Sequence, residues 1–140
     1  MTPTLDRLVD LERYPLDRPD DPAYVAAVDA ARVSLRADGC AVVPQLVTAA
    51  TVAALNDEIV ANKGTTHFST QAINPYFHTE VDPAFPDHHP VNTFSERSSG
   101  FIPGDSWDAA GPTSVLFRAP ELARFIADCL EEPELHCYAD

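Results

Sequence analysis

Two histidines and a glutamate have side chains of the types that could hold a transition-metal ion. His78 and Glu80 are separated by one residue, and His136 follows much later in the chain. Two histidines and one carboxylate on one face of Fe(II) leave the opposite face open for oxygen and a chelating co-substrate. Prolines at 75 and 83 flank the first pair, whereas such ligands usually lie at a strand end. We therefore expect no metal site in this chain. The alternative is that a metal ion is held by His78, Glu80 and His136.

Other candidate metal ligands and nucleophiles form weaker patterns. Residues 87–90 read DHHP. Because adjacent side chains of an extended segment point in opposite directions, this run predicts a solvated or substrate-facing loop. The three cysteines lack metal-type pairing, and Cys40, within an apolar run, is interpreted as an unreactive core thiol. No phosphate-binding glycine loop or nucleophile elbow is present, so we expect no catalytic residue.

Arg97 is the residue that we expect to bind substrate. It is the only lysine or arginine between Lys63 and Arg118, and aromatic residues and glycine surround it. A guanidinium can donate two parallel hydrogen bonds to a carboxylate, so Arg97 could clamp an acidic group of a small molecule. The alternative is that it balances the charge of the neighbouring Glu96. The sequence leaves both roles open.

Charge and length restrict the possible functions. The 140 residues carry 22 acidic and nine basic side chains, a net charge of −13, which would repel nucleic acid and anionic membranes. There is no apolar run of the ~20 residues that a membrane-spanning helix needs, and no basic, apolar secretion signal. The odd number of cysteines suggests a reducing compartment. We expect one cytoplasmic domain with a small-molecule substrate and no nucleic-acid or membrane partner.

The first half of the chain predicts a helix, a strand and a second helix over residues 22–63. Prolines break the pattern of residues 1–20, which we expect to be weakly ordered. Asp21 before Pro22 predicts the start of a helix over 22–37, which Gly39 would end. The β-branched run 40–43 predicts a buried strand, and Thr48 predicts the cap of a helix over 49–62.

The second half predicts a long loop, a third helix and the start of a strand. Residues 65–112 hold six prolines, four histidines and many aromatic residues without a clear period, which indicates an ordered active-site loop. Within 113–140, a helix is expected from Pro120 to before Pro133, followed by a strand from Leu135. One or two short strands cannot cover three amphipathic helices well, so we expect the front portion of a longer domain.

Four segments carry a resemblance to a known enzyme family. Residues 38–48 read DGCAVVPQLVT and continue into a helical pattern, which resembles the opening of Fe(II)/2-oxoglutarate-dependent oxygenases of the phytanoyl-CoA hydroxylase type. Residues 74–77 (NPYF), 94–101 (FSERSSGF) and 135–140 (LHCYAD) are similar to BesD-type free-amino-acid radical halogenases and their hydroxylase relatives. The resemblance covers about residues 20–140.

The resemblance implies an α+β fold: N-terminal helices, first strands and a lid loop of a double-stranded β-helix (jelly-roll, cupin-like), apparently incomplete. It implies Fe(II) and 2-oxoglutarate, with chloride in a halogenase, and hydroxylation or halogenation of a free amino acid or similar metabolite. The family's iron motif does not match any residue here, so we expect this chain alone to be inactive. Arg97 is the residue carried over. The alternatives are a non-catalytic small-molecule or protein-binding module and a poorly folding fragment.

Overall fold

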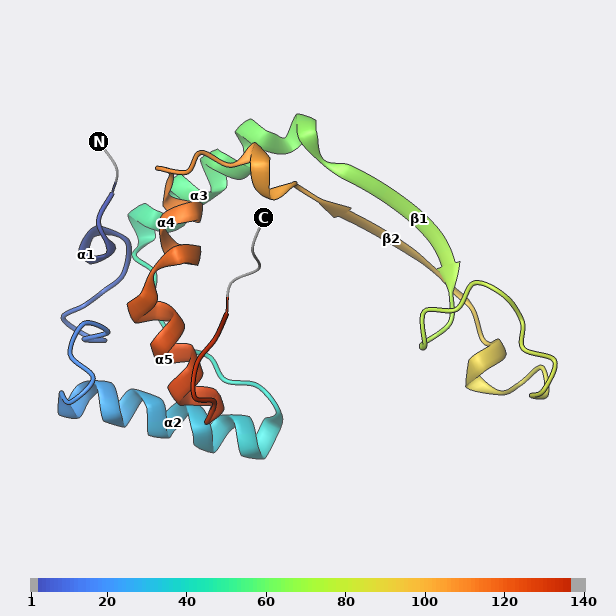
Figure 1. Ribbon diagram of the computed structural model, residues 1–140, viewed down its shortest axis with the longest axis horizontal. Helices are drawn as coiled ribbons and strands as arrows, with labels where there is room; N and C mark the ends of the chain where they lie inside the picture. Colours follow the sequence, from blue (N-terminus) through green and yellow to red (C-terminus); the bar gives the residue numbers. More distant parts are fainter. Residues whose placement is uncertain (1–2, 137–140) are drawn as a thin grey trace. The chain divides into compact units, whose positions relative to one another are not determined.

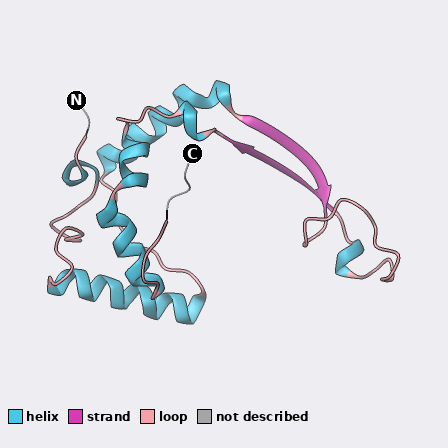
Figure 2. Cartoon of the chain, viewed as in Figure 1, coloured by secondary structure: helices cyan, strands magenta, loops and turns pink. Residues whose placement is uncertain are grey.

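The computed structural model describes residues 3–136, which divide into two units. The first unit comprises residues 3–61 and 107–136 and is helical, and the second comprises residues 62–106 and is built on a two-stranded antiparallel sheet (Figures 1 and 2). The chain therefore contains both helices and strands, as the α+β class requires. No helix within residues 3–136 is long and apolar enough to cross a membrane.

The helix expected over 22–37 is present as α2 (Pro22–Asp38), with the expected caps. The Asp21 carboxylate accepts a hydrogen bond from the Ala23 amide at 2.9 Å. Gly39 closes the helix with a left-handed φ of 72°, which a residue without Cβ adopts at little cost. Tyr24 and Val28 are buried four residues apart, so they define the face of α2 that packs inward.

Helices α3 (Ala49–Asn62) and α4 (Pro112–Arg118) are joined by a side-chain cap. Thr48 caps α3 as expected, because its hydroxyl accepts from the Thr51 amide at 3.2 Å. Glu58 on α3 accepts from the backbone amide of Thr113 at 2.9 Å and also from its hydroxyl. The Glu58 carboxylate thereby provides an acceptor for a backbone amide in the first turn of α4, where amides have no partner within the helix. The sequence pattern did not predict this helix, which begins at the last residue of the predicted loop 65–112.

Helix α5 (Pro120–Leu130) is the expected third helix, and it packs against α2 (Figure 1). The rings of Tyr24 and Phe125 meet edge to face with centroids 5.5 Å apart. Arg32 donates from Nε and Nη2 to the Asp128 carbonyl at 2.8 and 2.6 Å, which satisfies a carbonyl at the end of α5. The Tyr24 hydroxyl donates to the Asp128 carboxylate.

The structure differs from the expectation that residues 1–20 are weakly ordered. This segment contains α1 (Leu5–Leu8) and contributes the buried Val9 and Leu16 to the core of the first unit. Asp10 N donates to Leu46 O at 2.9 Å, and Arg124 Nη2 donates to Leu16 O at 2.8 Å. The prolines do stop a long helix, but tertiary contacts order the segment.

The predicted strand at 40–43 is wrong, and so is the core position of Cys40. These residues form no strand, Cys40 is exposed, and Val42 has 83% of its surface exposed. A β-branched run becomes a strand only where neighbouring backbone pairs with it, and no strand of the first unit does so here. The buried thiol is that of Cys129, whose pKa is raised by burial.

The second unit contains an antiparallel pair, β1 (His67–Ile73) and β2 (Ser95–Phe101), where a region without strands was expected. The two strands pair along their whole length, from His67 opposite Phe101 to Ile73 opposite Ser95. Both faces are exposed almost throughout. Because neither face is buried, the strands lack the alternation of polar and apolar residues that sequence patterns detect.

The strand expected from Leu135 is not formed at its first two residues, Leu135 and His136. Its continuation at 137–138 lies outside the described residues.

A first prediction tests the order of the N-terminal segment. Leu16→Ala removes a side chain that is 0% exposed and leaves a cavity, so unfolding in urea should require about 2–5 kcal/mol less free energy. Leu130→Ala, where the side chain is 48% exposed, is the matched control and should cost less than half as much. Equal losses for the two variants would contradict the core position of Leu16.

A second prediction concerns alkaline pH. Burial, and then the hydrogen bond to the Asp128 carboxylate, raise the pKa of Tyr24 from 10.0 to about 12. A raised folded-state pKa stabilises the fold below pH 10, and this stability is lost as pH rises through 12. The free energy of unfolding should therefore fall more steeply between pH 10 and 12 in the natural chain than in Tyr24→Phe. Tyr14→Phe, which instead loses a bond to the Pro44 carbonyl, should keep the steep fall.

Candidate functional site

One face of the β1–β2 hairpin gathers polar side chains around a single cation. Because strand residues alternate between faces, the register places the odd-numbered residues of both strands together. Arg97 on β2 lies directly opposite Gln71 on β1. In the next pair of this face, the hydroxyls of Ser69 and Ser99 are hydrogen-bonded at 3.2 Å. These two residue pairs therefore present a guanidinium, an amide and two hydroxyls to solvent.

A hollow of about 190 Å³ lies over this face. It is lined by Ser69, Gln71, Ile73, Phe77, Arg97 and Ser99. The guanidinium carbon of Arg97 lies 5.5 Å from the centroid of the Phe77 ring, within the range of a cation–π contact. This contact restrains the arginine without using its hydrogen-bond donors, so they remain available to a ligand.

The structure bears on the two roles that the sequence left open for Arg97. Glu96 and Arg97 are adjacent in β2, so their side chains point to opposite faces of the hairpin. Among residues 3–136, no carboxylate lies within ion-pair distance of the Arg97 guanidinium. The geometry therefore favours an arginine that can accept a carboxylate from a ligand over one that balances Glu96.

Asn74 holds the turn that carries Phe77. Its side chain is only 3% exposed, and its Oδ1 accepts hydrogen bonds from the amides of Tyr76 at 2.9 Å and His78 at 2.8 Å. Its Nδ2 donates to the Val91 carbonyl at 2.5 Å. These bonds hold Phe77 with a positive φ of 65°, a conformation that a bulky residue adopts only when its surroundings impose it.

Asn92 orders the rest of the loop between the strands. Its Nδ2 donates to the carbonyls of Asp82 at 2.9 Å and Phe85 at 3.0 Å, and its Oδ1 accepts from the Asp82 amide at 2.8 Å. Sequence reasoning missed both asparagines. The available signal was that asparagine favours turns by bonding to nearby backbone.

The alternative iron ligands are divided between the two units. His78 and Glu80 are exposed in the second unit, and His136 is exposed in the first, where its Nε2 lies 3.1 Å from Oε1 of Glu134. Within each unit, the described residues contain no group of three His, Cys, Asp or Glu side chains that could hold a metal ion. Neither unit by itself therefore brings together three such ligands among its described residues.

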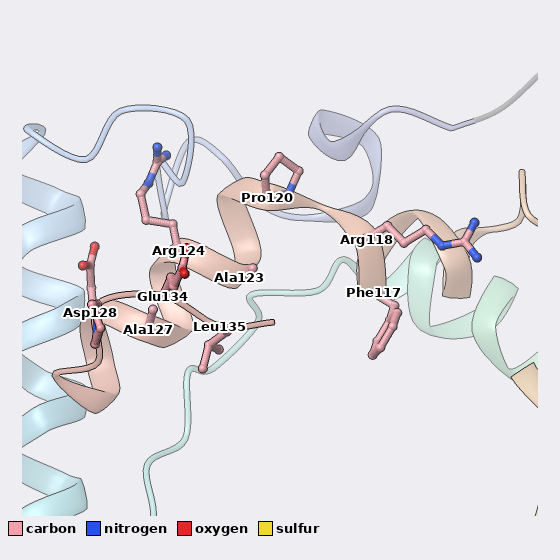
Figure 3. Close-up of a pocket in the computed structure, with 10 residues that line it drawn as sticks. Phe117, Arg118, Pro120, Ala123, Arg124, Ala127, Asp128, Glu134 and Leu135 are labelled. Carbon is pink, nitrogen blue, oxygen red and sulfur yellow. The ribbon is translucent and has the colours of Figure 1, made fainter. Parts of the chain in front are cut away.

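A second hollow, of about 370 Å³, runs beside α5 in the first unit (Figure 3). Figure 3 shows Arg124 reaching from α5 toward the N-terminal segment, where it donates to Leu16 O. Asp128, also in its lining, accepts from Tyr24. Because these charged groups already hold helices and loops together, we assign this groove to the fold and keep the Arg97 face as the candidate site.

Comparisons with protein families, with curated proteins and with solved structures find no match to this chain.

A third prediction tests the role of Asn74. Asn74→Ala leaves the Tyr76 and His78 amides without their acceptor, at a cost of about 1–3 kcal/mol in local stability. Hydrogen exchange at these two amides should therefore become about tenfold faster or more. Asn56→Ala, at an exposed position of α3, is the control and should leave both rates unchanged. Unchanged exchange in Asn74→Ala would contradict the assigned role.

Proposed function

We propose that this chain forms the scaffold and substrate-binding portion of an Fe(II)/2-oxoglutarate-dependent oxygenase. The enzyme would be a hydroxylase or halogenase acting on a free amino acid or a similar small metabolite. The observation that carries this proposal is the Arg97 guanidinium, exposed in a polar hollow and without a carboxylate partner within residues 3–136. The motif resemblance at 38–48 and 94–101 supplies the family.

Arg97 would bind the substrate through its carboxylate. The planar guanidinium donates two parallel hydrogen bonds, while the hydroxyls of Ser69 and Ser99 lie in the same hollow. In a chain of net charge −13, a local cation is also what allows an anion to approach. Because the hollow is open to water, we expect a dissociation constant on the order of 1 mM.

The exposed hairpin supports a place in a larger sheet. A two-stranded hairpin is marginally stable in water and gains stability from further strands or a packed helix. Both faces of β1 and β2 are exposed, as strands awaiting further partners would be. The jelly-roll of the proposed family would supply such strands. Its iron and 2-oxoglutarate ligands would come from polypeptide outside residues 3–136, and no reaction step is assigned to a residue of this chain.

The second candidate is a non-catalytic module that binds a small molecule. The observation that favours it is that the Arg97 face is built from residues of the second unit alone and needs no metal. Both candidates share the carboxylate clamp but differ in whether the chain belongs to an iron-dependent enzyme.

A fourth prediction tests the shared clamp. In calorimetry without metal, at least one of L-alanine, L-leucine and L-glutamine should bind the natural chain. Arg97→Met should weaken its binding at least about tenfold by removing the charged donors. Arg18→Met, at another exposed arginine, is the control and should leave binding unchanged. The matching amine, which is the bound amino acid without its carboxylate, should bind more weakly. Equal binding of the amine and the amino acid would refute the clamp.

Turnover separates the two candidates. Oxygen consumption and succinate formation are measured with Fe(II) and 2-oxoglutarate. The measurement is made first for this chain and then for the whole product of its gene. We expect no turnover from this chain, and turnover from the longer protein if it is an oxygenase. Activity of this chain that depends on His78, Glu80 and His136 would refute the proposal that the iron ligands lie outside residues 3–136.

A further inference from the structure

His89 does not line the Arg97 hollow but is hydrogen-bonded to the loop that carries Phe77. Its Nδ1 accepts from the Val91 amide at 3.2 Å, which caps the short 3-10 helix η2 (Pro90–Asn92). Its ring stacks on that of Phe85 with centroids 4.5 Å apart. The imidazole is therefore held with an unprotonated Nδ1 directed at the backbone.

The bonds continue from Val91 to the candidate site. The Val91 carbonyl accepts from Nδ2 of Asn74, whose Oδ1 accepts from the amides of the turn that carries Phe77. The Phe77 ring in turn lies against the Arg97 guanidinium. Asn74 is buried, so the side chain at the centre of this path has little freedom to absorb a displacement. These contacts form a continuous path from His89 to Arg97 through Val91, Asn74 and Phe77.

We propose that His89 is a positioning residue for the Arg97 face, and that carboxylate binding there weakens when His89 gains a proton. The proposal rests on the carboxylate clamp proposed above. Histidine is the side chain that ordinarily changes charge between pH 5 and 8. A proton on Nδ1 converts the acceptor of the Val91 amide into a donor, so the two N–H groups oppose each other and the bond is lost.

Several charged or titratable groups lie around this path. Asp82, Asp87 and His88 belong to the same loop, and His78 lies in the turn that Asn74 holds. The free amino acids used as ligands carry no net charge between pH 5 and pH 8, so a change in the overall charge of this acidic chain would by itself change their binding little. Weaker binding at low pH therefore distinguishes the His89 path from the general effect of charge.

The experiment compares three variants. His89→Asn keeps an acceptor suited to a helix cap but does not titrate. His89→Ala removes the acceptor at every pH, and His88→Asn changes the exposed neighbouring histidine as the control. Binding of L-alanine, or of the panel member that binds best, is measured at pH 8 and pH 5, and the backbone amides of Val91 and Phe77 are followed by NMR across the same range.

For the natural chain and His88→Asn, we expect binding about fivefold weaker at pH 5 than at pH 8, the effect of one hydrogen bond. The Val91 and Phe77 amides should shift with the midpoint of the His89 ring. His89→Asn should bind equally at both pH values without these shifts, and His89→Ala should bind weakly at both. A Phe77 shift that persists in His89→Asn would overturn the proposal, since another group would then cause it.

The two readouts separate this proposal from the proposed function. If the panel does not bind the natural chain at pH 8, the carboxylate clamp is refuted. The NMR titration needs no ligand, so it still decides whether His89 positions the Phe77 turn.

Discussion

The contact between α2 and α5 is the interaction on which the first unit depends. Phe125 meets Tyr24 edge to face, and Arg32 binds the Asp128 carbonyl where α5 ends. Burial of the two rings supplies the apolar contribution, while the arginine adds two side-chain hydrogen bonds to a carbonyl near the end of α5. Leu16 from the N-terminal segment completes this core. Tyr24 therefore links hydrophobic packing to a polar network, which is why its hydroxyl pKa is raised.

The second unit is stabilised in a different way. Its strands are exposed on both faces, so pairing between their backbones and the side-chain bonds of Asn74 and Asn92 hold it together. Such a unit has little buried apolar surface to resist local opening.

The candidate site follows from strand geometry and charge. Alternation in β2 turns Glu96 away from Arg97, and the cation–π contact with Phe77 restrains the guanidinium without using its donors. In an acidic chain this leaves a local cation beside hydroxyl and amide groups. The arrangement is suited to holding a small carboxylate.

Local rules were sufficient where a signal lies within a few residues. Asp21, Pro22 and Gly39 define α2 because capping and left-handed backbone preferences act locally. The sequence also singles out Arg97 as the only lysine or arginine between Lys63 and Arg118, and its role in binding stays a prediction. Tertiary structure alone decided what depends on distant partners. The run at 40–43 has β propensity but no strand to pair with, whereas the polar β1 and β2 pair despite lacking alternation. Strand pairing, the burial of Val9 and Leu16 and the fixing of Phe77 by Asn74 all require contacts that sequence spacing does not encode.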